Sequence, residues 1–133
     1  MKKKKILVID DEQIVLDSVR KILSADEFEV DTTLSGQEGI KKALFHDYDI
    51  VLTDVRMPDT SGKTVLREIK RAKPSLPVII ITGYSNIGSA RETMQLGAAD
   101  YVEKPFTPEE LLKAISEARQ HASQPPMDGS WNS

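Results

Sequence analysis

Short, unbroken runs of apolar or β-branched residues recur along this chain. A run of this length is too short for a helix and is typical of a strand that is buried on both faces of a sheet. Three such runs occur, at residues 6–9, 50–53 and 78–81. Two further strands are predicted at 28–34, where apolar and polar positions alternate, and at 100–103, a brief segment that ends before a proline.

Between and after these runs, apolar residues return at the spacing of a helix with one buried side. Ser35 and Gly36 open the second of these segments. The clearest start is Thr107, which is followed by Pro108 and then by Glu110 in the position that completes a capping box. We predict five helices, at about residues 12–24, 36–45, 61–72, 86–96 and 107–121.

The first and fourth helices carry more specific expectations. In the first, the apolar positions at helical spacing are Ile14, Val15, Val19, Ile22 and Leu23. In the fourth, Gly88 interrupts the pattern, and few positions are apolar, namely Ile87, Ala90, Met94 and Leu96. We therefore predict that the fourth helix is the weakest and the most mobile.

Strand and helix alternate five times, which predicts an α/β fold with a doubly wound, five-stranded parallel sheet and helices on both faces. Right-handed crossovers place the C-terminal ends of all parallel strands at one edge of the sheet, where such folds bind ligands. Polar residues stand at or just after the ends of four strands. We expect five of them to share this edge, namely Asp10, Asp11, Asp54, Thr82 and Lys104.

Composition narrows the class of protein. The 133 residues suffice for one core, so we predict one domain at residues 1–123 and a flexible tail or linker remnant at 124–133. The net charge of −3 argues against direct nucleic-acid binding. No cysteine is present, and no apolar run is long enough for a signal peptide or a membrane span. We expect a cytoplasmic protein.

The acids at the predicted edge suggest a metal site. Two carboxylates 4 Å apart repel each other by about 4 kcal/mol at an effective dielectric constant near 20, and a divalent cation removes that conflict. Oxygen ligands without histidine or cysteine favour Mg²⁺, with Mn²⁺ as an alternative. The predicted ligands are Asp10 and Asp11, with Asp54 and the main-chain carbonyl of Arg56 adding to them.

Phosphoryl chemistry fits the remaining residues. Asp54 can act as a nucleophile toward phosphorus and form an acyl phosphate. The hydroxyl of Thr82 and the ammonium of Lys104 suit the phosphoryl oxygens on the side away from the metal. Arg56 and Tyr84 each stand two residues beyond such a site residue, where bulk would hinder the attacking water, so we predict a long-lived acyl phosphate.

In this order, the motifs resemble the receiver domain of two-component response regulators over roughly residues 4–121. The matching residues are Asp10-Asp11, Asp54 with Met57-Pro58 and Gly62, Thr82-Gly83, Tyr101 and Lys104-Pro105. The segments DVRMPD, ITGYS and EKPF are most similar to those of regulators of the nitrogen-regulation and nitrogen-fixation type.

The resemblance implies more than the pattern does. It implies a flavodoxin-like three-layer sandwich with strand order 2-1-3-4-5 and a cis Lys104-Pro105 bond. It implies that Asp54 takes a phosphoryl group from a sensor histidine kinase or a phosphotransfer protein, in a signalling receiver that is not a classical enzyme. Thr82 and Tyr101 are then the switch residues. The fourth helix, fifth strand and fifth helix would change to control an effector, with a phosphorylation-linked homodimer as a further expectation.

Three other functions were weighed against this one. A haloacid-dehalogenase-type phosphatase also uses a nucleophilic aspartate with Mg²⁺, but it needs an acid two residues later, where Arg56 stands. A nucleotide- or flavin-binding domain needs a glycine-rich or hydroxyl-rich loop after the first strand, where acids stand instead. An interaction module that is never phosphorylated ranks last, because all the expected ligands are present.

Overall fold

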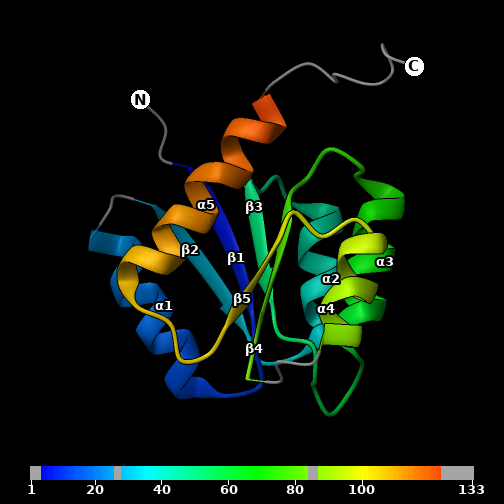
Figure 1. Cartoon of the computed structure of the whole chain (residues 1–133), viewed down its shortest axis with the longest axis horizontal. Helices are drawn as coiled ribbons and strands as arrows, with labels where there is room; N and C mark the ends of the chain where they lie inside the picture. The colour runs from blue at the N-terminus through cyan, green and yellow to red at the C-terminus, as the bar shows by residue number, and fades with distance from the viewer. Residues whose placement is uncertain (1–3, 26–27, 84–86, 124–133) are drawn as a thin grey trace.

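The structure is a computed structural model that describes residues 4–25, 28–83 and 87–123. Strands and helices alternate along the whole of it (Figure 1). The strands are β1 (Lys5–Ile9), β2 (Glu29–Thr33), β3 (Ile50–Thr53), β4 (Val78–Thr82) and β5 (Asp100–Glu103). The helices are α1 (Gln13–Ala25), α2 (Gly36–Phe45), α3 (Gly62–Ala72), α4 (Ile87–Gln95) and α5 (Pro108–Ser123).

All five strands are parallel and follow the order β2-β1-β3-β4-β5. Helices α1 and α5 cover one face of the sheet, and α2, α3 and α4 lie on the other (Figure 1). The predicted doubly wound sheet, its order and the three-layer arrangement are therefore confirmed. The C-terminal ends of the strands meet at one edge because every crossover returns the chain to the same starting edge.

Two apolar cores fill the spaces between the layers. Successive strand residues point to opposite faces, so Ile6 and Val8 pack toward α1 and α5 while Leu7 and Ile9 pack toward α2 and α3. Strands β1, β3 and β4 are buried on both faces, as their apolar runs predict. A strand enclosed in this way holds the residue at its end in a fixed position.

Helix starts follow the sequence closely. Ser35 and Ser61 cap α2 and α3 by accepting hydrogen bonds from the N–H groups of Glu38 and Thr64. At α5 the capping box is complete, because Thr107 N–H donates to Glu110 Oε1 (2.8 Å) and Glu110 N–H donates to Thr107 Oγ1 (3.1 Å). The Lys104-Pro105 peptide bond is cis, as the resemblance implies.

Several side chains differ in solvent exposure from what their polarity predicts. Ile14 is 74% exposed, and Leu16 takes its place on the buried side of α1. In α4, Met94 is 46% exposed while Thr93 is fully buried. Leu34 follows the end of β2 and lies exposed. The expectations for Ile14 and Met94 were wrong because an apolar residue beside a helix stripe can satisfy the same spacing without facing the core.

Three predictions concern residues that the structure does not describe or stay untested. The proposed tail at 124–133 and Tyr84 lie outside the residues that the structure describes. Greater mobility of α4 stays a prediction. Among the described residues, no helix is both long enough and apolar enough to cross a membrane.

Candidate functional site

Four strands deliver the candidate site residues to one edge of the sheet. Asp10 follows β1, Asp54 follows β3, Thr82 ends β4 and Lys104 follows β5. The edge is continuous, since the N–H of Asp10 donates to Thr33 O and the N–H of Asp54 donates to Ile9 O. The ladder therefore extends by one residue beyond the strands and fixes the backbone of both acids.

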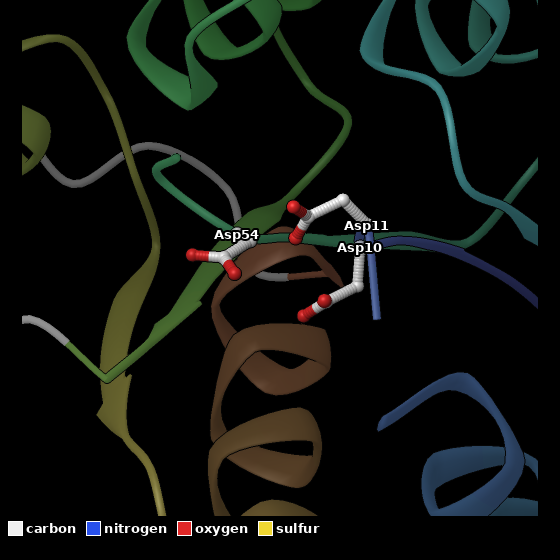
Figure 2. A group of neighbouring side chains, drawn as sticks. All are labelled: Asp10, Asp11 and Asp54. Atoms are coloured by element: carbon white, nitrogen blue, oxygen red, sulfur yellow. The ribbon is translucent and has the colours of Figure 1, made fainter. Parts of the chain in front are cut away.

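Three carboxylates form a cluster at this edge. Oxygens of Asp10, Asp11 and Asp54 all lie within 4.8 Å of one another, and Figure 2 shows the three side chains converging. Asp10 is fully buried and Asp54 is 7% exposed, whereas Asp11 faces solvent. The cluster is thus closed toward the core and open on the side of Asp11.

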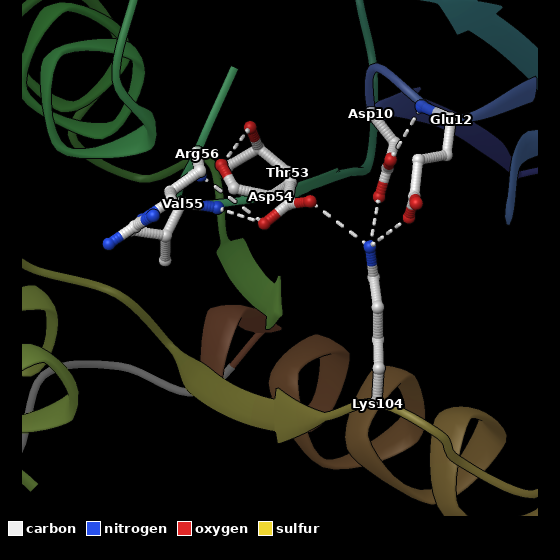
Figure 3. Close-up of polar contacts among 7 residues, drawn as sticks. All are labelled: Asp10, Glu12, Thr53, Asp54, Val55, Arg56 and Lys104. Carbon is white, nitrogen blue, oxygen red and sulfur yellow. Dashed lines mark hydrogen bonds and ion pairs between the residues drawn. The ribbon is translucent and has the colours of Figure 1, made fainter. Parts of the chain in front are cut away.

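Lys104 reaches into this cluster from the end of β5, which is separated from β3 by β4. Its Nζ lies 2.8 Å from Asp10 Oδ2 and 3.0 Å from Asp54 Oδ2, and Figure 3 shows it between the two carboxylates. A weaker contact joins Nζ to Glu12 Oε1 at 3.4 Å. One ammonium therefore bridges acids that come from the beginning and the middle of the chain.

The pKa values of Asp10 and Lys104 are both raised, but for different reasons. Burial raises the pKa of the Asp10 carboxyl, and the hydrogen bonds from Lys104 and from the Glu12 N–H offset this only partly. Burial alone would lower the pKa of Lys104, but its hydrogen bonds to Asp10 and Asp54 and their charges outweigh burial and raise it. Three carboxylates nevertheless face one ammonium, so the pocket keeps an excess of negative charge.

The carboxylate of Asp54 is oriented by the backbone that follows it. Its Oδ1 accepts hydrogen bonds from the N–H of Val55 (2.6 Å) and of Arg56 (3.3 Å), and its Oδ2 accepts from Lys104 (Figure 3). Such bonds fix the rotation of the carboxylate, and they need the chain to turn sharply after β3. The carboxylate is thereby held in a fixed orientation, ready to act as a nucleophile.

This donor set fits a hard divalent cation. The cluster offers only carboxylate oxygens, one of them solvent-exposed, and its charge is not neutralised by one lysine. Mg²⁺ typically binds through one or two carboxylates and keeps several of its waters, so an open acidic pocket of this kind suits it. The chain therefore presents an acidic pocket that can hold a metal.

The remaining predicted residues are placed as follows. Thr82 is fully buried at the end of β4, and its carbonyl accepts a hydrogen bond from the N–H of Lys104 (2.7 Å). Tyr101 is partly buried and packs against the apolar core on the α2 and α3 face. Arg56 is exposed, and its carbonyl as a metal ligand stays a prediction. The prediction of a long-lived acyl phosphate is likewise untested.

Two contacts were missed by the sequence analysis. Glu12 joins the Lys104 network, although it is not among the candidate site residues of the sequence analysis. A third acid after β1, on the same edge, is the signal that could have found it. Asp59 also has no role in the sequence analysis, yet its carboxylate accepts three hydrogen bonds from the start of α2. No sequence signal marks that contact, because it depends on how α2 and α3 pack.

Comparison with known proteins gives one consistent result. Residues 6–116 match the family described as the response regulator receiver domain. The cell cycle response regulator CtrA of Brucella ovis is 37% identical over 111 residues, which is 84% of this chain and 48% of CtrA. The chain thus spans about half the length of the curated relatives that it matches.

Solved structures agree with this result. The response regulator receiver domain protein from Clostridium thermocellum is 40% identical with a TM-score of 0.83, covering 89% of this chain and 95% of that one. The beryllofluoride-activated NtrC4 receiver domain dimer is 33% identical with a TM-score of 0.85, covering 90% and 98%. Regulators named CtrA and NtrC4 match to a similar degree, so identity does not single out the nitrogen-regulation type.

Proposed function

Since this chain belongs to the response regulator receiver domain family, the phospho-accepting switches of two-component signalling, we propose that Asp54 is the residue that accepts its phosphoryl group. The orientation of the Asp54 carboxylate carries this proposal. Two backbone N–H groups hold one oxygen, and the ammonium of Lys104 lies 3.0 Å from the other. The side chain is nearly buried but belongs to a pocket that opens to solvent.

The transfer exchanges one bond to phosphorus for another. An Asp54 oxygen forms a bond to phosphorus while the bond from phosphorus to the imidazole nitrogen of a phosphohistidine breaks. The electron pair of the broken bond stays on that nitrogen, and a neutral histidine leaves because the other ring nitrogen carries the proton. Lys104 and the Thr82 hydroxyl bind the phosphoryl oxygens, and Lys104 offsets the added negative charge.

Mg²⁺, with Mn²⁺ as an alternative, is the proposed cofactor. Asp10, Asp11 and Asp54 would hold it together with the main-chain carbonyl of Arg56. When bound, the cation neutralises negative charge on the carboxylates and on the incoming phosphoryl group. The excess of acids over lysine supports this assignment, because two like-charged carboxylates otherwise share a buried space.

The donor approaches this pocket from the side of α1. A hollow of about 440 Å³ beside Lys104 is lined mainly by apolar side chains, including the exposed Ile14 and the partly buried Phe106. A sensor histidine kinase or a phosphotransfer protein must bring its histidine to Asp54, and an apolar surface that shares Lys104 with the pocket gives it a place to bind. This hollow is the donor contact that we propose.

Phosphorylation is proposed to act as a switch. Thr82 would move toward the phosphoryl group, Tyr101 would turn further inward, and the surface of α4, β5 and α5 would change for an effector or for a second copy of the chain. A hollow of about 500 Å³ between β5 and α5 lies on that surface. A phosphoryl group can shift the protein only toward a conformation that makes better contacts with it. The Thr82 hydroxyl offers such a contact.

The test is labelling by a small phosphoryl donor. Wild-type protein incubated with acetyl phosphate and Mg²⁺ is expected to gain the mass of one phosphoryl group, and Asp54→Asn is expected to gain none. Asp47→Asn is the matched control, because Asp47 is a fully exposed aspartate whose carboxylate contacts only Lys73, at 3.9 Å. Intact mass spectrometry and gel filtration report modification and assembly together.

Other outcomes would favour the alternatives. Labelling of Asp54→Asn to the wild-type level would overturn the assignment of Asp54. Rapid release of inorganic phosphate from many equivalents of donor, without accumulation of phosphorylated protein, would indicate a phosphatase rather than a switch. If wild-type protein gained no mass at any Mg²⁺ concentration, an interaction module that is never phosphorylated would be the better description.

A further inference from the structure

The loop between β3 and α3 is attached to a neighbouring helix by one side chain, that of Asp59. Its Oδ2 accepts hydrogen bonds from the Ser35 hydroxyl (2.7 Å) and the Gln37 N–H (3.1 Å), and its Oδ1 accepts from the Gly36 N–H (3.1 Å). The first N–H groups of a helix have no partner within the helix and carry a partial positive charge. These bonds lower the pKa of Asp59, so the group is charged at neutral pH.

Close packing reinforces this attachment. A Cβ atom on Gly36 would lie 2.3 Å from Thr60 Cγ2 and 3.1 Å from Met57 Cε, so the loop rests directly on the first residue of α2. The base of the loop is closed by a hydrogen bond from the Gly62 N–H to Val55 O (2.7 Å). The loop is therefore fixed at its base and at its middle, and it has little freedom in between.

Helix α2 does not depend on this carboxylate for its own start. Ser35 already caps the helix, because its Oγ accepts a hydrogen bond from the Glu38 N–H (3.0 Å). Loss of the Asp59 carboxylate would leave that cap in place but would remove the three hydrogen bonds that the carboxylate accepts from Ser35 and the first residues of α2. Loss of the carboxylate would therefore change the position of the loop more than the start of the helix.

The same loop supplies the backbone on one side of the pocket. The N–H groups of Val55 and Arg56 hold Asp54, and the carbonyl of Arg56 belongs to the proposed metal ligands. We propose that Asp59 is a positioning residue for the metal: by attaching the loop to α2 it holds the Arg56 carbonyl in place and so strengthens binding of the divalent cation. This inference rests on the proposed function.

Asp59→Asn tests the role with little change in shape. An amide has one acceptor oxygen where the carboxylate has two, so its NH₂ group must face an N–H or hydroxyl donor of α2. Asp47→Asn makes the same change of charge near the other end of α2 and is the matched control. Asp59→Glu keeps the charge and provides a second, milder variant.

The main measurement needs no phosphoryl donor. Thermal unfolding is followed at increasing Mg²⁺, and the concentration that gives half of the maximal stabilisation is compared between variants. Partners of metal ligands typically change metal affinity by about 10- to 100-fold, and Asp59 acts one step further away, so we expect a rise of roughly threefold to tenfold for Asp59→Asn. Asp47→Asn is expected to match wild type, and Asp59→Glu to fall between them.

A merely structural role gives a different result. In that case Asp59→Asn lowers the stability of the metal-free protein but keeps the wild-type Mg²⁺ midpoint, and the inference is overturned. The labelling rate adds a second criterion, since saturating Mg²⁺ should restore the rate in Asp59→Asn if only affinity is lost. If wild type shows neither labelling nor a Mg²⁺ shift, the proposed function fails instead, so the two failures are distinguishable.

Discussion

Lys104 is the residue on which the electrostatics of the pocket depend. Its ammonium contacts Asp10, Asp54 and Glu12, and its side chain is only 15% exposed. Removing one member of a buried charge pair leaves its partner without compensation, which costs more than the pair itself contributes. The cost is largest for Asp10, because no solvent reaches its carboxylate to replace the lost partner.

Replacement of this lysine therefore destabilises the metal-free protein. We expect Lys104→Met to lower the free energy of unfolding by about 2 kcal/mol, less than the 3–5 kcal/mol typical of a fully buried pair because the pocket is open at Asp11. Urea unfolding without Mg²⁺ measures this, with the exposed Lys113→Met as a control. The double variant with Asp10→Asn should recover most of the loss, and no recovery would contradict the pairing.

The principal site residues were predictable from the sequence because strand ends are predictable. A short apolar run followed by an acid places that acid at the carboxyl edge of a parallel sheet, as happens at Asp10 and Asp54. Long side chains are harder to place. The contact of Glu12 with Lys104 and that of Asp59 with α2 depend on how elements pack, which no local pattern encodes.

The connection from β3 to α3 is the element that shapes the pocket. Gly62 starts α3 directly against the end of β3, and a Cβ atom there would lie 2.1 Å from Asp54 O and 2.6 Å from Val55 Cα. Both are backbone atoms that cannot rotate away. A side chain at this position would therefore have to displace the backbone of Asp54 and Val55.

Gly62→Ala is expected to be costly. Overpacking typically costs 1–3 kcal/mol, and because backbone must move here we expect a loss of about 3 kcal/mol in the free energy of unfolding, with slower labelling of Asp54. Gly83→Ala is the matched control, because a Cβ atom on Gly83 has no atom within 4 Å. Equal stability of the two variants in urea would show that the loop adapts.

Elements were easier to predict than the direction of each side chain. The five strands and five helices follow from runs and spacing, and the caps at Ser35 and Thr107 follow from local hydrogen bonding. The buried side of α1 and α4 was misassigned at Ile14 and Met94. A helix with apolar residues on more than one side leaves its orientation to the neighbours it packs against, here β1 and β5.

At the scale of the whole molecule, folding couples to pH through carboxylates that gain partners. Hydrogen bonds from the Gln37 N–H, the Ser35 hydroxyl and the Gly36 N–H hold the pKa of Asp59 below its ordinary value of 3.8. A group whose pKa is lower in the folded protein adds stability above its unfolded pKa. That contribution is lost as the pH falls through the folded value.

The pH dependence of Asp59→Asn follows from this sign. Wild type is expected to be more stable than the variant at pH 7, and the difference should begin to shrink near the unfolded pKa of 3.8 and nearly vanish at lower pH. Unfolding in urea at a series of pH values measures the difference. A gap that stayed constant from neutral to acidic pH would show that the charge of Asp59 does not contribute.

The Lys104 bridge also sets the order in which a newly made chain can complete its acidic pocket. Lys104 lies 94 positions after Asp10 and 50 after Asp54, so the acids leave the ribosome long before the cation that compensates them. Until then the growing chain carries repelling carboxylates at an unfinished edge. The bridge can form only once the fifth strand has docked, so this pocket is completed after nearly all of the sheet has been made.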